Sequence, residues 1–182
     1  MNVNKSSPPP LTKALYLDTE TTGLDERAEI IEIAILDATG NVLLDSLVKP
    51  TSPISDAASK VHGIIMSMLG DAPSWQQLAG KVKTLLDGQL VVAHNAEFDE
   101  RMIRQSCLKY GVAEPTDVLW NCTMQMLTTS NGGKWPSLSK AKALLRDQIS
   151  ESSSDNLHRA RHDAETCRQI HQALLLEQPE LC

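Results

Sequence analysis

Three apolar runs near the start of the chain, joined by short polar spacers, constrain its fold more than any other feature. Residues 14–18, 29–36 and 42–48 are rich in Ile, Leu and Val, and a polar spacer at 39–41 contains a glycine. Runs of this length and composition are typical of buried β-strands, and a short spacer with glycine indicates a hairpin. The chain is therefore expected to begin as a three-stranded meander.

After this meander, strand-like runs alternate with stretches of helical character. Strands are expected at 89–93 and 118–121. Helices are expected at 55–61, 74–87, 95–110, 123–129, 137–146 and 159–176. A meander followed by alternating strands and helices predicts an α/β fold with a mixed five-stranded sheet flanked by helices. We expect one domain over residues 13–178, preceded by a disordered, proline-rich lead-in over residues 1–12.

The charge pattern restricts the kind of partner that the chain can take. A net charge of −6 at pH 7 argues against a large non-specific nucleic-acid surface. The acidic excess lies in the first hundred residues, and the later part holds one basic cluster, made up of Lys134, Lys140, Lys142, Arg146, Arg159 and Arg161. This arrangement favours binding of a short strand end over binding of long duplex DNA. Without a membrane-length apolar run or a secretory signal, a cytoplasmic protein with no membrane partner is expected.

Acidic residues recur at the expected ends of strands and starts of helices. Asp18 and Glu20 close the first run, Asp99 lies in the first turn of its helix, and Asp163 lies near the start of the last helix. Hard cations such as Mg²⁺ prefer carboxylate oxygens. Two such ions can clamp the attacking and leaving oxygens of a phosphodiester displacement. The four acids are therefore candidate ligands for two Mg²⁺ ions, for which Mn²⁺ would substitute.

Helical phase distinguishes the two histidines near Asp163. The buried stripe of the last helix is expected to contain Ala160, Ala164, Cys167, His171 and Leu174. Asp163 lies about 60° from the centre of that stripe, at its rim, whereas His162 points to the solvent side. His158 would also point away if it were helical, so it is expected on the preceding loop. From there it could serve as a general base. A zinc site made of His158, His162 and Cys167 is a weaker alternative, because the same phase separates these groups.

Taken in order, these motifs resemble those of the DEDDh (DnaQ-like) 3′→5′ exonucleases. This group includes exonuclease X, RNase T and the proofreading subunit of bacterial replicative DNA polymerase. The family patterns D-x-E, N-x-x-F-D and H-x-x-x-x-D are matched by Asp18/Glu20, Asn95/Phe98/Asp99 and His158/Asp163. The resemblance extends over residues 14–176 and implies an RNase H-like fold.

The resemblance also implies an activity and the residues that perform it. A member of this family would remove nucleoside monophosphates from a single-stranded 3′ end by a two-metal mechanism, with His158 as the general base. The four acids would hold the two Mg²⁺ ions. Contacts with the terminal nucleotide are implied for Thr21, Thr22, Gly23, Leu24, Asn95 and Phe98.

Two alternatives to a DNA exonuclease stay open. An exoribonuclease of the RNase T or oligoribonuclease kind would use the same centre, because the metals do not read the sugar. The stretch 120–124 looks most like exonuclease X relatives and favours DNA. A catalytically idle nucleic-acid-binding module is the second alternative, although all five catalytic residues are present. The resemblance leaves open both a polymerase partner and a homodimer.

Three further residues lie outside the motifs. Glu32 sits among isoleucines in the second run, and a buried acid needs a partner, so a supporting role near Asp18 is a candidate. His62 belongs to a loop motif frequent in the family, but Ile65 replaces the usual threonine, which argues against a substrate contact. Trp135, which follows two glycines, is a candidate for contact with a nucleobase.

Overall fold

The structure is a computed structural model that describes residues 13–128, 132–149 and 158–177. The predicted lead-in over residues 1–12 lies outside the described residues. In the described part of the chain, no helix is both long and apolar enough to cross a membrane.

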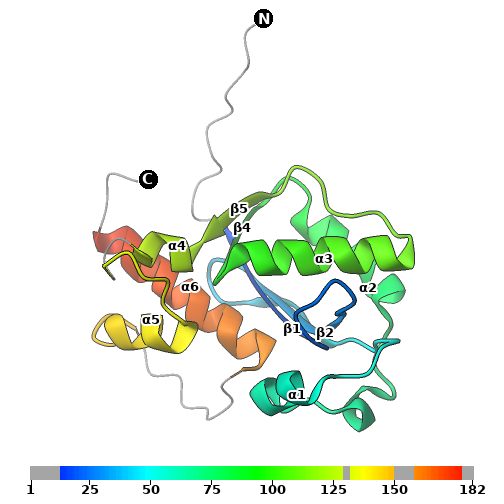
Figure 1. The fold of residues 1–182 in the computed structure, drawn as a ribbon. Helices are drawn as coiled ribbons and strands as arrows, with labels where there is room; N and C mark the ends of the chain where they lie inside the picture. Colours follow the sequence, from blue (N-terminus) through cyan, green and yellow to red (C-terminus); the bar gives the residue numbers. More distant parts are fainter. Residues whose placement is uncertain (1–12, 129–131, 150–157, 178–182) are drawn as a thin grey trace, which may run out of the picture.

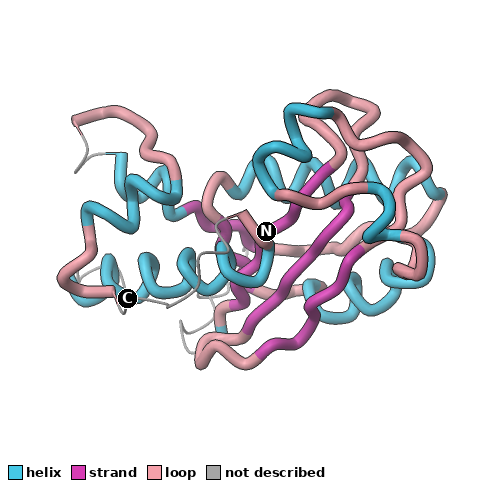
Figure 2. The backbone as a smooth tube through the Cα atoms, turned by 90° about the horizontal axis from the view of Figure 1, so that it is seen from below, coloured by secondary structure: helices cyan, strands magenta, loops and turns pink. Residues whose placement is uncertain are grey.

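Five strands form one mixed sheet, as the sequence predicts (Figures 1 and 2). They are β1 (Leu15–Thr21), β2 (Ile30–Leu36), β3 (Val42–Leu47), β4 (Leu90–Ala93) and β5 (Leu119–Cys122). The strand order is β3-β2-β1-β4-β5. The meander strands pair antiparallel, whereas β4 is parallel to both β1 and β5. The central strand β1 therefore joins the antiparallel half of the sheet to the parallel half.

The helices also match the prediction, with shifts of one or two residues at their ends. They are α1 (Asp56–His62), α2 (Trp75–Leu86), α3 (Ala96–Tyr110), α4 (Thr123–Thr128), α5 (Leu138–Leu144) and α6 (Ala160–Glu177). A 3-10 helix, η2 (Met66–Leu69), was not predicted. It is too short to show a helical period in the sequence.

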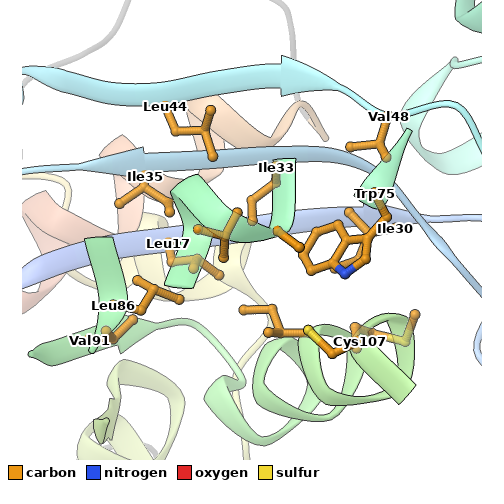
Figure 3. Close-up of a cluster of buried hydrophobic side chains, with 14 of the residues drawn as sticks. Leu17, Ile30, Ile33, Ile35, Leu44, Val48, Trp75, Leu86, Val91 and Cys107 are labelled. Carbon is orange, nitrogen blue, oxygen red and sulfur yellow. The ribbon is translucent and has the colours of Figure 1, made fainter. Parts of the chain in front are cut away.

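Alternation along β1 divides its side chains between the two faces of the sheet. Leu15 and Leu17 belong to a large core that includes Trp75 and Leu86 of α2 and Cys107 of α3 (Figure 3). Because successive strand residues point to opposite faces, the next positions along β1 face the other way. This large core lies between the sheet and helices α2 and α3, so these two helices cover this face of the sheet.

The opposite face carries α6, which packs on β1, β2 and β4 (Figure 1). Tyr16 and Ala34 of the sheet contact Ala160, Ala164 and Cys167 of the helix, all of them buried. The stripe predicted for this helix is thus correct, and His171 and Leu174 complete it as buried residues. Small helical side chains let α6 approach the sheet closely, which brings the start of the helix beside the end of β1.

One local expectation was wrong, and one residue adopts an uncommon backbone conformation. The first strand does not end at Asp18 but continues to Thr21, because its polar end stays paired with β2 through Glu20 and Glu32. Asn95 immediately precedes α3, and its side chain makes no capping hydrogen bond. Its backbone is left-handed, with φ of 76°, a conformation that asparagine tolerates better than most residues.

Candidate active site

The end of β1 and the start of α6 bring three carboxylates together. Asp18 and Glu20 are two positions apart on β1 and so lie on the α6 face, in line with Tyr16. Asp163 lies in the first turn of α6 and reaches the same place. One ligand oxygen from each of Asp18, Glu20 and Asp163 lies within 4.8 Å of the other two. Three of the four predicted ligands therefore form one compact group.

Asp99 approaches this group from α3, on the other side of β1. It is buried, and its Oδ1 accepts a hydrogen bond of 2.8 Å from Thr19 Oγ1. It does not belong to the group defined by the 4.8 Å distances, but its charge acts on Asp18. The fourth predicted ligand is thus adjacent to the cluster and held by a separate contact.

Burial and mutual repulsion disturb the protonation of these acids. Burial, then the charges of Asp99 and Asp163, raise the pKa of Asp18 well above its usual range. Burial and the charge of Asp163 raise the pKa of Glu20 to about 8. Burial raises the pKa of Asp99 to about 7, against the hydrogen bond from Thr19, and burial also raises the pKa of Asp163.

Such a cluster is chemically suited to divalent cations. Each carboxylate oxygen is a hard donor, and the acids raise one another's pKa through the repulsion between their charges. A bound Mg²⁺ or Mn²⁺ would supply positive charge and favour the ionised carboxylates. The residues present therefore fit the metal pair that the sequence implies.

His158 lies on the loop before α6, as helical phase predicts. Its Nδ1 is 3.9 Å from Asp163 Oδ2, and its side chain is 52% exposed. Its backbone is left-handed, with φ of 65°, which is rare for a residue other than glycine. The imidazole therefore lies beside Asp163 and is about half exposed to solvent.

His162 was expected to face solvent, and this expectation is only partly met. Its side chain is half-buried and lines a small cavity together with Ser137, Lys142, His158 and Asp163. The packing of α5 against α6 covers the side of the helix that phase alone assigns to water. The alternative zinc set gains no support, because the described ligand group contains carboxylates alone.

The segment after β1 holds the predicted contacts for a terminal nucleotide. Thr21 and Thr22 are buried, and both hydroxyls are engaged: Thr21 Oγ1 donates to Gly23 O and Thr22 Oγ1 accepts from Glu29 N. Leu24, by contrast, is 77% exposed. The threonine side chains therefore shape the loop, whereas Leu24 is presented to solvent.

Neighbouring helices hold this loop in place. Gln105 of α3 donates to the backbone carbonyl oxygens of Asp25 and Ala28. The ring of His62 hydrogen-bonds Thr21 O at 3.2 Å and accepts from Ile64 N at 3.0 Å. Both nitrogens of His62 are thus used within the protein, in keeping with the expectation that it makes no substrate contact.

On α3, Phe98 is half-buried and lies under the Arg101 guanidinium, 5.2 Å from the ring centroid. Asn95 is half-buried at the start of the helix. Beside them, the ring of His94 hydrogen-bonds Thr123 Oγ1 at 2.9 Å and Pro136 O at 3.0 Å. This ring ties the segment with Trp135, which is 60% exposed, to β4. Sequence reasoning did not identify His94.

Glu32 also has a partner that the sequence did not reveal. Its carboxylate accepts hydrogen bonds from Arg159 and from Ala160 N, at the start of α6. Thr19, which holds Asp99, was likewise missed. Its position between Asp18 and Glu20 was the available signal, because alternation places it on the opposite face of β1 from the two acids.

Comparison with known proteins identifies relatives of this chain. The family model RNase_T, described as an exonuclease, matches residues 15–170. An uncharacterised exonuclease of Escherichia phage 186 is 43% identical over 98 residues, which cover 54% of this chain and 50% of the phage protein. The chain thus spans about half of that relative. DNA polymerase III subunit epsilon of Pasteurella multocida is 30% identical over 173 residues, covering 88% of this chain and 67% of the subunit.

A solved structure is similar to this chain over nearly the whole length of both proteins. Exonuclease X in complex with 5′ overhanging duplex DNA superposes with a TM-score of 0.72 at 26% identity, covering 91% of this chain and 93% of that chain. This likeness confirms the RNase H-like exonuclease fold that the motifs implied.

Proposed function

Because this chain belongs to the RNase_T family of exonucleases, we propose that it is a metal-dependent 3′→5′ exonuclease acting on single-stranded DNA ends. The proposal rests on one observation above all: Asp18, Glu20 and Asp163 gather within 4.8 Å, with His158 beside Asp163. Paired cations at clustered carboxylates and an adjacent base are the requirements of phosphodiester hydrolysis.

Each part of the site has a role in this proposal. Two Mg²⁺ ions, held by Asp18, Glu20, Asp99 and Asp163, would supply positive charge and acidify the attacking water. His158, in its neutral form, would accept the proton that the water loses. Its exposure leaves it free to meet the substrate, and its 3.9 Å distance to Asp163 keeps it beside the reacting group.

The loop after β1 would bind the terminal nucleotide. Backbone groups of Thr21, Thr22 and Gly23 would contact it, and the exposed Leu24 would pack against its base. On α3, Asn95 and Phe98 would line the far side of the same nucleotide. Trp135 would offer a stacking surface for a second base.

Similarity to DNA enzymes supports DNA over RNA as the substrate. The solved relative bound duplex DNA with a 5′ overhang, and the epsilon relative is a subunit of a DNA polymerase. By the same reasoning, a DNA polymerase is the protein partner that we propose.

The test uses matched 5′-labelled DNA and RNA oligonucleotides, each incubated with Mg²⁺ and with EDTA. We expect the DNA strand to shorten from its 3′ end, with release of nucleoside monophosphates, and we expect EDTA to abolish cleavage. Shortening from the 5′ end, or full activity in EDTA, would contradict the proposal. Faster loss of RNA would favour the exoribonuclease alternative, and binding without cleavage would favour the idle module.

A further inference from the structure

Glu32 occupies an unusual position for an acid. It lies buried in β2, directly opposite Glu20 in the antiparallel pair, so the two side chains share one face of the sheet. Two acids side by side in a buried sheet repel one another unless a cation intervenes. The neighbour of a candidate metal ligand therefore requires a partner of its own.

Arg159 is that partner. Its Nε lies 3.0 Å from both Glu32 carboxylate oxygens, and its Nη2 donates to Oε1. The backbone N–H of Ala160, the first residue of α6, donates to Oε2 at 3.0 Å. With donors on both oxygens, Glu32 is occupied and is not a further metal ligand. It instead joins the sheet to the start of the helix.

The residue next to this junction is the candidate base. His158, immediately before Arg159, has the left-handed backbone described above, which a residue other than glycine keeps only when its surroundings hold it. Two local contacts contribute: His158 Nδ1 lies 3.9 Å from Asp163 Oδ2, and Asp163 N donates to Arg159 O at 3.0 Å. Both contacts lie within the junction itself. The contact with Glu32 joins the junction to β2, beside the packing of Ala160 on the sheet.

From this geometry we propose that Glu32 and Arg159 are positioning residues for the catalytic centre. Their ion pair seats the start of α6 so that His158 and Asp163 stand at a fixed place beside Asp18 and Glu20. The inference rests on the proposed nuclease function, because it describes how that site is assembled. A displacement of about 1 Å at a reacting group can cost about a hundredfold in rate, so such a device matters beyond stability.

The test compares Glu32→Gln, Arg159→Met and the double variant with Arg168→Met as a control. Arg168 makes a comparable two-pronged ion pair with Glu165 on the same helix, but neither residue belongs to the carboxylate group. Three quantities are measured: the single-turnover cleavage rate, the affinity for Mn²⁺ by calorimetry without substrate, and the melting temperature.

We expect Glu32→Gln and the double variant to lose about 10- to 100-fold in both cleavage rate and Mn²⁺ affinity. The double variant should be no worse than the worse single variant, because both substitutions break one contact. Arg168→Met should melt at a lower temperature and yet keep wild-type rate and affinity. Arg159→Lys keeps the charge without the two-pronged geometry, so it should be intermediate and remains informative if Arg159→Met does not fold.

Wild-type rate and Mn²⁺ affinity in folded Glu32→Gln would overturn the inference, as would strictly additive losses in the double variant. A wild-type protein that neither cleaves nor binds Mn²⁺ would instead overturn the proposed function and the inference with it. The two failures are therefore distinguished by the wild-type measurement.

Discussion

Thr19 Oγ1 donates a hydrogen bond of 2.8 Å to Asp99 Oδ1, and this contact joins β1 to α3 beside the carboxylate cluster. Asp18 and Glu20 flank Thr19 in sequence, but they face α6. One three-residue segment of β1 thus serves both sides of the sheet. It places two carboxylates on one side and holds a third acid from the other.

The first prediction removes this hydrogen bond. Because the contact with Thr19 lowers the pKa of Asp99, Thr19→Val should raise that pKa further and leave Asp99 less firmly oriented. Partners of this kind typically contribute about 10- to 100-fold to metal affinity. We expect a loss on that scale in Mn²⁺ affinity, measured by calorimetry at pH 7. Thr84→Val, which alters an exposed helical hydroxyl of α2, should leave the affinity unchanged.

The second prediction concerns the ligands themselves. Asp18→Asn and Asp163→Asn should each lower the cleavage rate by more than about a hundredfold. A hundredfold is about the largest loss seen when a residue that only hydrogen-bonds to a metal ligand is replaced, and a ligand should cost more. Without metal, each variant should melt at or above the wild-type temperature, because one of several repelling charges is gone. Asp45→Asn, at an exposed acid of β3, serves as the control. Strong destabilisation by Asp163→Asn would indicate a structural role for that residue.

The third prediction follows from the raised pKa of Glu20. Its folded-state pKa of about 8 exceeds the ordinary value of 4.5, so between these values the folded protein binds more protons than the unfolded one. Stability of the metal-free protein should therefore fall as pH rises from about 6.5 to 8. Buried histidines with lowered pKa values, such as His171, change the stability at lower pH and not in this window.

Thermal melts across this pH window test the effect of Glu20. Glu20→Gln should flatten the decline, and saturating Mg²⁺ should raise the melting temperature most at the upper end. Asp37→Asn is the control, since Asp37 is a surface acid with a lowered pKa. An unchanged slope in Glu20→Gln would show that Glu20 does not carry the effect.

The fourth prediction separates the two histidines near Asp163. Loss of a general base typically costs about 10²- to 10⁴-fold in rate. We expect His158→Ala to lose activity on that scale while it still binds Mn²⁺ and the oligonucleotide. His162→Ala should stay within a few-fold of wild type. Single-turnover cleavage of a 5′-labelled oligonucleotide at saturating Mg²⁺ compares them, and the reverse outcome would move the base to His162.

The fifth prediction addresses Leu24 in the loop after β1. Leu24→Ala should weaken binding of a single-stranded 3′ end by about tenfold, because burying a leucine side chain against a base stabilises the complex by about 1.5–3 kcal/mol. The melting temperature should not change, since Leu24 is exposed. Binding is measured by anisotropy in Ca²⁺. Leu108→Ala, at another exposed leucine, is the control, and equal losses in both variants would argue against a specific role.

The elements of this fold could be predicted because each carries a local signal. The apolar runs of β1 and β2 and the stripe of α6 all lie within a few residues of the structure they determine. The same local periodicity placed His158 on a loop and Asp163 at a rim. The sequence alone therefore predicted the five strands of the described sheet, the loop position of His158 and the position of Asp163 at the edge of the buried face of α6.

The contacts that assemble the site could not be predicted in the same way. Glu32 and Arg159 are 127 positions apart, and nothing near either residue indicates the other. Glu20 lies opposite Glu32 through the pairing register, which depends on the whole hairpin. The half-burial of His162 depends on α5, whose packing against α6 is a tertiary effect.

The packing of α6 on β1 also has a consequence for synthesis of the chain. Asp18 and Glu20 leave the ribosome early, whereas Asp163 belongs to the last helix that the structure describes. All five strands of the sheet precede α6 along the chain, because the last of them ends at Cys122. Domains generally fold as units during translation, so the carboxylate cluster can form only after α6 has been made. If the cluster is the nuclease centre, a chain interrupted before residue 158 would lack both His158 and Asp163, and the face of the sheet around Tyr16 would have no helix to cover it.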